Sequence, residues 1–168
     1  MKKETIYSGK IVTLAREETI LPGGLHYTQE IIHHPGGACV LPIFDNGDVL
    51  LLRQYRYAAG GYIWEAPAGK LDIPGEDPAH CASRELIEEA GYRASNIEHL
   101  ITILTTPGFC DERLHLFKGS GLTPEKQEME EHEVIEVHRF THAEISKMLS
   151  SKEILDAKTL IALKLCGY

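Results

Sequence analysis

Paired cysteines, a basic excess and long apolar runs are all missing from this 168-residue sequence. Its four cysteines occur singly, without a CxxC pair, which argues against a zinc site and against a disulfide framework. No apolar run approaches the roughly 20 residues of a membrane-spanning helix. The N-terminal MKKETIYSGK has no apolar stretch after its lysines, so we expect no secretory signal, no membrane partner and a cytoplasmic location.

Repeats, low-complexity tracts and Gly/Ser-rich linkers are absent as well, so the length favours one domain over residues 1–168. The composition, with 43% hydrophobic and 25% charged residues, is typical of a globular chain and excludes a disordered one.

Negative charge is what the sequence has in excess, and it is concentrated. The formal net charge is −8, and residues 76–89 and 125–136 together hold 11 acidic and two basic residues. The other 142 residues hold 14 acidic and 15 basic residues and are nearly neutral. A nonspecific nucleic-acid binder needs a basic face, so we expect no nucleic-acid partner. Clustered carboxylates are costly unless water or cations compensate for them, which raises the hypothesis of a metal site.

Strand patterns dominate the first third of the chain, and helices and strands alternate after it. Strands are predicted over residues 6–20, 26–34, 38–44, 49–55, 63–66, 97–105, 113–118 and 134–140. Asn46-Gly47 lies between two of the apolar runs, and this dipeptide is a strong signal for a β-hairpin. Helices are predicted over residues 78–90, 141–149 and 154–165. This order of elements favours an α+β fold.

The helix over residues 78–90 has the clearest ends. Asp77 suits the N-cap, Pro78 suits the first helical position, and Gly91 suits the C-terminal stop.

This helix also concentrates carboxylates. Glu85 and Glu89 are four residues apart and share one face, with Glu88 at its edge. Arg84 can pair with Glu88 at i, i+4 spacing. A solvated helix with one internal ion pair would explain an isolated pair of glutamates, but the surrounding sequence favours a functional interpretation.

The helix is part of a longer pattern that runs from Gly69 to Tyr92 and resembles the Nudix box, G-x5-E-x7-R-E-U-x-E-E-x-G-U, in which U is a bulky apolar residue. All the specified residue types are present, namely Gly69, Glu76, Arg84, Glu85, Leu86, Glu88, Glu89, Gly91 and Tyr92. The first gap has six residues rather than five, and the extra residue falls in the loop before the helix. The resemblance implies an α/β/α sandwich with a mixed sheet and an N-terminal antiparallel β extension.

Three further segments resemble the ADP-ribose pyrophosphatase and nucleoside-diphosphate-sugar hydrolase subgroup of that family. They are Trp64-Glu-Ala-Pro-Ala-Gly69, Arg53-Gln-Tyr-Arg56, and Pro107, which lies 15 residues beyond Tyr92. Each also has a structural interpretation: Trp64 as core filling, Pro107 as an ordinary turn proline, and the arginines as surface residues.

The resemblance implies a set of site residues. A Mg²⁺ ion, for which Mn²⁺ can substitute, is expected on oxygen ligands from Ala68, Glu85, Glu88 and Glu89. The implied catalytic residues are Glu131 as the base, Glu133 as a metal ligand or alternate base, Glu88, and Arg84, which orients the glutamates. The implied substrate contacts are Arg56, Trp64, Glu65, Pro107 and Gly108. Arg56 can donate two hydrogen bonds to phosphate oxygens.

The implied activity is Mg²⁺-dependent hydrolysis of the diphosphate bond of ADP-ribose or a related nucleoside diphosphate sugar, which gives a nucleoside monophosphate and a sugar phosphate. Alternatives are a preference for GDP-mannose, another such sugar or a dinucleotide, and a non-catalytic Nudix domain that senses a nucleotide. An interaction module with an acidic patch would leave the box unexplained. The resemblance also implies a homodimer that pairs through residues 1–36.

Overall fold

The computed structural model describes residues 2–128 and 134–168. In chain order the elements are β1 (Lys3–Ser8), β2 (Thr13–Ile20), β3 (His26–His33), β4 (Gly37–Pro42), β5 (Val49–Arg56), the 3-10 helix η1 (Tyr57–Ala59), β6 (Gly61–Glu65), β7 (Ala68–Lys70), α1 (Pro78–Ala90), β8 (Tyr92–Leu104), β9 (Arg113–Pro124), β10 (Ile135–Phe140), α2 (His142–Ser150) and α3 (Ala157–Leu165).

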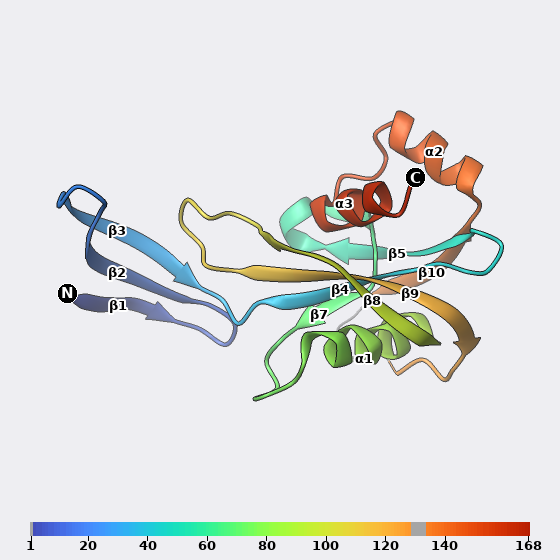
Figure 1. Ribbon diagram of the computed structural model, residues 1–168, viewed down its shortest axis with the longest axis horizontal. Coiled ribbons are helices and arrows are strands. Elements are labelled where there is room, and N and C mark those ends of the chain that lie inside the picture. Colours follow the sequence, from blue (N-terminus) through green and yellow to red (C-terminus); the bar gives the residue numbers. More distant parts are fainter. Residues whose placement is uncertain (1, 129–133) are drawn as a thin grey trace.

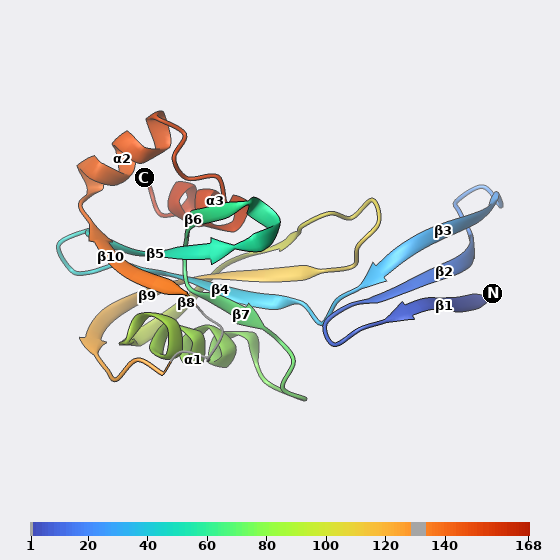
Figure 2. The same ribbon diagram turned by 180° about the vertical axis from the view of Figure 1, so that it is seen from behind.

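Two sheets form the middle of the body, with α1 on one side and α2 and α3 on the other (Figures 1 and 2). One sheet is mixed and has the order β7-β4-β9-β8, in which β4 and β9 run parallel. The other has the order β10-β5-β6 and is antiparallel. The predicted α+β sandwich with a mixed sheet is therefore confirmed.

The core consists of two layers because β4 and β5 are buried on both faces. Ala38 and Val40 of β4 pack toward α1, whereas Cys39 and Leu41 pack toward α2 and α3. This period of two follows from the alternation of side chains along a strand.

The predicted β-hairpin at Asn46-Gly47 is wrong, although the turn itself forms. Gly47 has a φ of 83° and its N–H donates to the carbonyl of Phe44 at 2.8 Å. Beyond one bridge between Ile43 and Val49, however, β4 and β5 separate into different sheets. Each strand is apolar on both faces and takes a central position with its own neighbours, which outweighs the local pairing signal.

The N-terminal sheet has the order β1-β2-β3, is antiparallel, and extends away from the body (Figure 1). The run predicted over residues 6–20 is two strands, because the chain reverses where the N–H of Gly9 donates to the carbonyl of Val12. Ile32 joins the sheet to the body by exchanging backbone hydrogen bonds with Phe109 and Asp111. The predicted N-terminal antiparallel extension is confirmed.

Helix α1 has the predicted ends. The Asp77 side chain accepts a hydrogen bond from the N–H of Ala79 at 2.8 Å, and Gly91 ends the helix with a φ of 69°. The other boundaries shift by a few residues. Asp156 caps α3, so this helix starts at Ala157 and not at 154, and β8 starts at Tyr92 and not at 97.

Within the residues that the structure describes, no helix is both long enough and apolar enough to span a membrane.

Candidate active site

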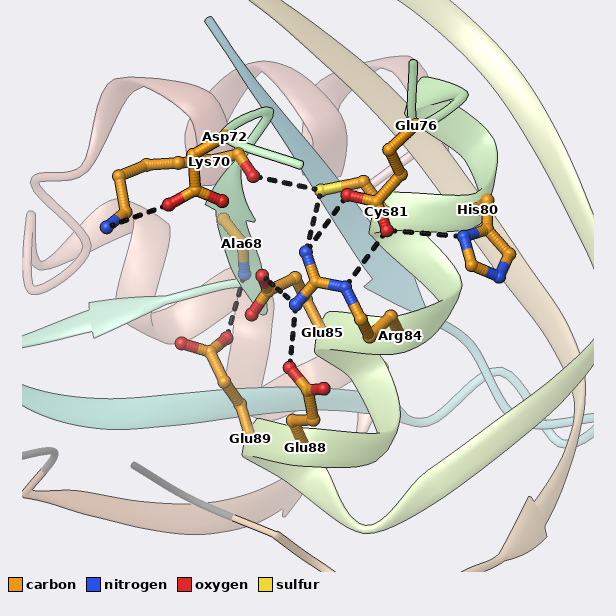
Figure 3. A network of polar contacts seen from close by, with 10 residues as sticks. All are labelled: Ala68, Lys70, Asp72, Glu76, His80, Cys81, Arg84, Glu85, Glu88 and Glu89. Atoms are coloured by element: carbon orange, nitrogen blue, oxygen red, sulfur yellow. Dashed lines mark hydrogen bonds and ion pairs between the residues drawn. The ribbon is translucent and has the colours of Figure 1, made fainter. Parts of the chain in front are cut away.

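Arg84 is the centre of a carboxylate network on α1 (Figure 3). Its Nη1 atom lies 2.7 Å from Glu85 Oε1 and 2.7 Å from Glu88 Oε2, and its Nε lies 3.0 Å from Glu76 Oε1. The hydrogen bonds that Arg84 donates to Glu76 outweigh the effect of burial and raise the pKa of Arg84 above its usual value. The predicted pairing of Arg84 with Glu88 is confirmed. The arginine therefore holds three glutamates in place.

The extra residue in the loop before α1 does not displace Glu76. The loop closes with a positive φ of 80° at Gly75 and a hydrogen bond from the N–H of Glu76 to the carbonyl of Ile73. The Glu76 side chain is buried, and its hydrogen bond with Arg84 holds the pKa of that carboxyl below its usual range.

Strand β7 provides the surface against which the carboxylates of α1 pack. Glu89 is only 2% exposed, and its Oε2 accepts a hydrogen bond from the N–H of Ala68 at 2.8 Å. A Cβ atom on Gly69 would lie 1.8 Å from Oε1 of Glu85, so the place of that side chain is occupied by the carboxylate. Glycine at position 69 is thus required by the position of Glu85.

The oxygen atoms on α1 and β7 fit a hard divalent cation by their chemistry. Glu85, Glu88 and Glu89 supply carboxylates along one stretch of helix, and Ala68 supplies a backbone carbonyl beside them. Among residues 2–128 and 134–168, no three acidic, imidazole or thiol groups are already gathered around one point. Glu85 and Glu88 contact Arg84 instead, so binding a cation requires their side chains to turn.

A cleft of about 730 Å³ brings this carboxylate network together with residues far away in the sequence. Ala68, Glu85 and Glu89 line it together with Arg56 from the end of β5 and Lys158 from the first turn of α3. The cleft therefore combines oxygen ligands for a cation with side chains that can bind an anion.

Arg56 is held by Glu65. Its Nε lies 2.7 Å from Oε1 and its Nη2 3.2 Å from Oε2 of that carboxylate, and Lys158 also donates to Oε2. Burial alone would raise the pKa of Glu65, but Arg56 and Lys158 outweigh it and lower the pKa. Glu65 is expected from the resemblance to contact substrate, yet in the structure its carboxylate is engaged with these two cations.

The structure does not bring Trp64, Pro107 or Gly108 into the lining of this cleft. Trp64 packs edge-on against His138 and Phe140 with ring centroids 5.1 Å apart, which agrees with the core-filling interpretation. Pro107 lines a separate pocket of about 410 Å³, and Gly108 is exposed next to it. Their substrate contacts stay predictions.

Glu131 and Glu133 lie outside the described residues. The chain on both sides of them is close to the site, however. The N–H of Glu128 donates to the carbonyl of Glu88 at 3.1 Å, and Val134 lines the cleft.

Lys158 and Asp156 were not predicted from the sequence. Asp156 could have been found as an N-cap, but its contact with Lys158 at 3.0 Å and the pairing of Lys158 with Glu65 depend on the fold.

Comparison with known proteins agrees with this geometry. Residues 33–162 match the sequence model of a protein family described as the NUDIX domain. The chain is 40% identical over 164 residues to an ADP-ribose pyrophosphatase of Bacillus subtilis (strain 168), which covers 96% of this chain and 88% of that protein. It is 38% identical over 166 residues to a methanol dehydrogenase activator of Bacillus methanolicus, which covers 98% and 89%.

A solved structure described as an ADP compounds hydrolase has the same fold, with a TM-score of 0.84, 23% identity, and coverage of 99% of this chain and 90% of that one. The match to the domain model and the extent of the 40% identity show that the chain belongs to the Nudix family.

Proposed function

We propose that the protein hydrolyses the diphosphate bond of ADP-ribose or a related nucleoside diphosphate sugar, giving a nucleoside monophosphate and a sugar phosphate. The observation that carries this proposal is the single cleft that joins the Nudix-box carboxylates Glu85 and Glu89 to Arg56. A diphosphate needs both a cation and a donor of hydrogen bonds to phosphate oxygens. The similarity to an ADP-ribose pyrophosphatase supports the choice of substrate class.

The cation is proposed to be Mg²⁺, with Mn²⁺ as a substitute, on Glu85, Glu88, Glu89 and the carbonyl of Ala68. When bound, such a cation polarises the phosphoryl oxygens and neutralises charge that develops during attack. Arg84 keeps the glutamates together and limits their mutual repulsion. Arg56 is proposed to bind a phosphate of the substrate by hydrogen bonds.

The water-activating base is proposed to be Glu131, with Glu133 as a metal ligand or alternate base. The position of the flanking residues supports this assignment. Gln127 donates to the carbonyl of Glu89 at 2.5 Å, which fastens one end of the segment to α1, and Val134 at the other end lines the cleft.

A substrate panel with Mg²⁺ tests the proposal. The panel contains ADP-ribose, GDP-mannose, UDP-glucose, NADH, diadenosine polyphosphates and nucleoside triphosphates. We expect the highest kcat/KM for ADP-ribose or another nucleoside diphosphate sugar, with the monophosphate among the products. Turnover of triphosphates alone would refute the substrate class.

A non-catalytic regulator is the second function that an observation favours, because the chain is similar to a methanol dehydrogenase activator. All glutamates of the box are present, however, and a domain that only senses a nucleotide has no need of them. Binding of ADP-ribose in calorimetry, without turnover of any compound in the panel, would favour this alternative.

A homodimer is proposed to form through residues 1–36. The N-terminal sheet exposes apolar side chains, among them Tyr7 at 60% and Tyr27 at 48%, and the body covers little of it. Exposed apolar surface of this kind marks contact sites between proteins. Sedimentation equilibrium is expected to give twice the mass of the chain, and a monomer at all concentrations would refute the dimer.

A cytoplasmic location and a single functional unit over residues 1–168 complete the proposal. All four cysteines are free, as expected in a reducing compartment. Cell fractionation that recovers the protein outside the cytoplasm would refute the location.

A further inference from the structure

Four charged side chains form a compact cluster beside the cleft, and none of them belongs to the Nudix box. This Arg56 cluster consists of Arg56, Glu65, Asp156 and Lys158. Lys158 contacts both Glu65 and Asp156, and Glu65 contacts Arg56 through both carboxylate oxygens. The cluster contains two positive and two negative groups and is neutral as a whole.

Burial is unequal within the Arg56 cluster. The side chain of Glu65 is 3% exposed and that of Lys158 is 13% exposed, whereas that of Arg56 is 43% exposed. Burial alone would lower the pKa of Lys158, but Asp156 and Glu65 raise it, so the ammonium group is charged. Removing one partner from such a buried set leaves an uncompensated charge.

The hydrogen-bonding geometry leaves one edge of Arg56 available. Glu65 uses the Nε and Nη2 edge of the guanidinium group. The remaining N–H groups, on Nη1 and Nη2, have no other protein acceptor among residues 2–128 and 134–168. An arginine edge with two parallel N–H groups matches two oxygens of a phosphate. Because Arg56 lines the cleft, this edge is available to a diphosphate there.

Lys158 is connected to the backbone of the fold through Asp156, which it contacts. Asp156 caps α3 by accepting hydrogen bonds from the N–H of Thr159 at 3.0 Å and from its hydroxyl at 2.6 Å. The same hydroxyl accepts a hydrogen bond from the N–H of Ala66 at 2.7 Å. Ala66 lies two residues before Ala68, whose N–H binds Glu89. The cluster and the carboxylates of the box are thus tied to the same short segment of backbone.

We propose that Lys158 is a positioning residue of the diphosphate site, which holds Glu65 so that Glu65 presents the open edge of Arg56 to the substrate. This inference rests on the function proposed above. Lys158 also compensates for the charge of Asp156. Without it, the cluster would carry one net negative charge beside the cleft, and Arg56 alone would have to neutralise Glu65. Both changes weaken the binding of an anion.

Replacing Lys158 with methionine leaves an unbranched side chain that is one atom shorter and removes the charge. We expect Lys158→Met to raise KM for ADP-ribose about 10-fold, the effect of one lost charge-assisted hydrogen bond, and to change kcat less than about 3-fold. Lys164→Met on the same helix is the matched control, because Lys164 is exposed and outside the cluster. An unchanged KM in Lys158→Met would overturn the inference.

Two further variants test why KM changes in Lys158→Met. One separates the loss of charge from a change in structure, and the other separates a positioning role of Lys158 from direct contact with the substrate. In Lys158→Met with Asp156→Asn the cluster is neutral again and the helix cap is kept, so KM should recover in part. In an Arg56→Ala variant, adding Lys158→Met should raise KM by less than a further factor of about 2. Lys158 is proposed to act through Arg56, and the effects of residues that are coupled in this way do not add. Full additivity would overturn the inference and indicate that Lys158 binds substrate itself.

If the wild type turns over no compound of the panel, that result counts against the proposed function. The inference about Lys158 is then tested by a measurement without substrate. Nitrogen-15 NMR of the ligand-free protein follows the Nε–H of Arg56, which is hydrogen-bonded to Glu65. We expect a slowly exchanging signal in the wild type and in Lys164→Met, and faster exchange in Lys158→Met. Equal exchange in the three proteins would overturn the inference.

Discussion

Replacing Glu89 with glutamine is expected to lower kcat for ADP-ribose about 10³-fold at saturating Mg²⁺, since a catalytic cation contributes several kcal/mol to transition-state stabilisation. Glu89 is buried and accepts the N–H of Ala68. Glutamine has the same shape and keeps an oxygen that can accept this bond. The substitution therefore removes the charge of a proposed metal ligand while the local packing stays the same.

Steady-state kinetics over a range of Mg²⁺ and Mn²⁺ concentrations, combined with calorimetric titration of the metal, measures this effect. Glu98→Gln is the control, because Glu98 is an exposed residue of β8 and its substitution makes the same change in net charge. Thermal unfolding shows whether both variants are folded. If Glu89→Gln turns over substrate like the wild type at saturating metal, the assignment of Glu89 as a ligand is wrong.

The part of the fold that the sequence predicts best is the part that local contacts determine. The ends of α1 depend on Asp77, Pro78 and Gly91, all of which lie within a few residues of the helix they delimit. The i, i+4 pair of Arg84 and Glu88 is likewise local. Such features depend on backbone conformation and helix geometry, which a short segment specifies by itself.

Strand pairing is where prediction from the sequence failed. The turn at Gly47 forms as predicted, yet β4 pairs with β7 and β9, and β5 pairs with β6 and β10. Except for β6, which follows β5 directly after η1, these partners lie far along the chain. A strand that is apolar on both faces gives no sign of which distant neighbour it will take.

The same limit applies to the candidate site. The box residues on α1 follow from one pattern, and Glu76 still reaches Arg84 although the loop is one residue longer. Lys158 and Glu65, in contrast, are 93 positions apart. Their contact requires α3 to pack next to the end of β6, which no local signal encodes.

Replacing Gly69 with alanine is expected to lower kcat about 10²-fold, the loss that a misplacement of catalytic groups by about 1 Å can cause. The new Cβ would lie 1.8 Å from Oε1 and 2.0 Å from Cδ of Glu85, so that carboxylate must leave its place beside Arg84. The backbone of Gly69 does not adopt a positive φ, so alanine itself is not strained there. The three atoms nearest to this Cβ all belong to the side chain of Glu85 and none to the backbone.

This combination distinguishes an effect on the site from an effect on the fold. Glu85 can turn away, so the melting temperature of Gly69→Ala should stay close to that of the wild type while kcat falls. Gly61→Ala is the matched control, because a Cβ there meets nothing within 4 Å and the residue has no positive φ. Equal activity of the two variants would show that the position of Glu85 beside β7 has no part in catalysis. The carboxylates that bind the cation would then have to be sought elsewhere on α1.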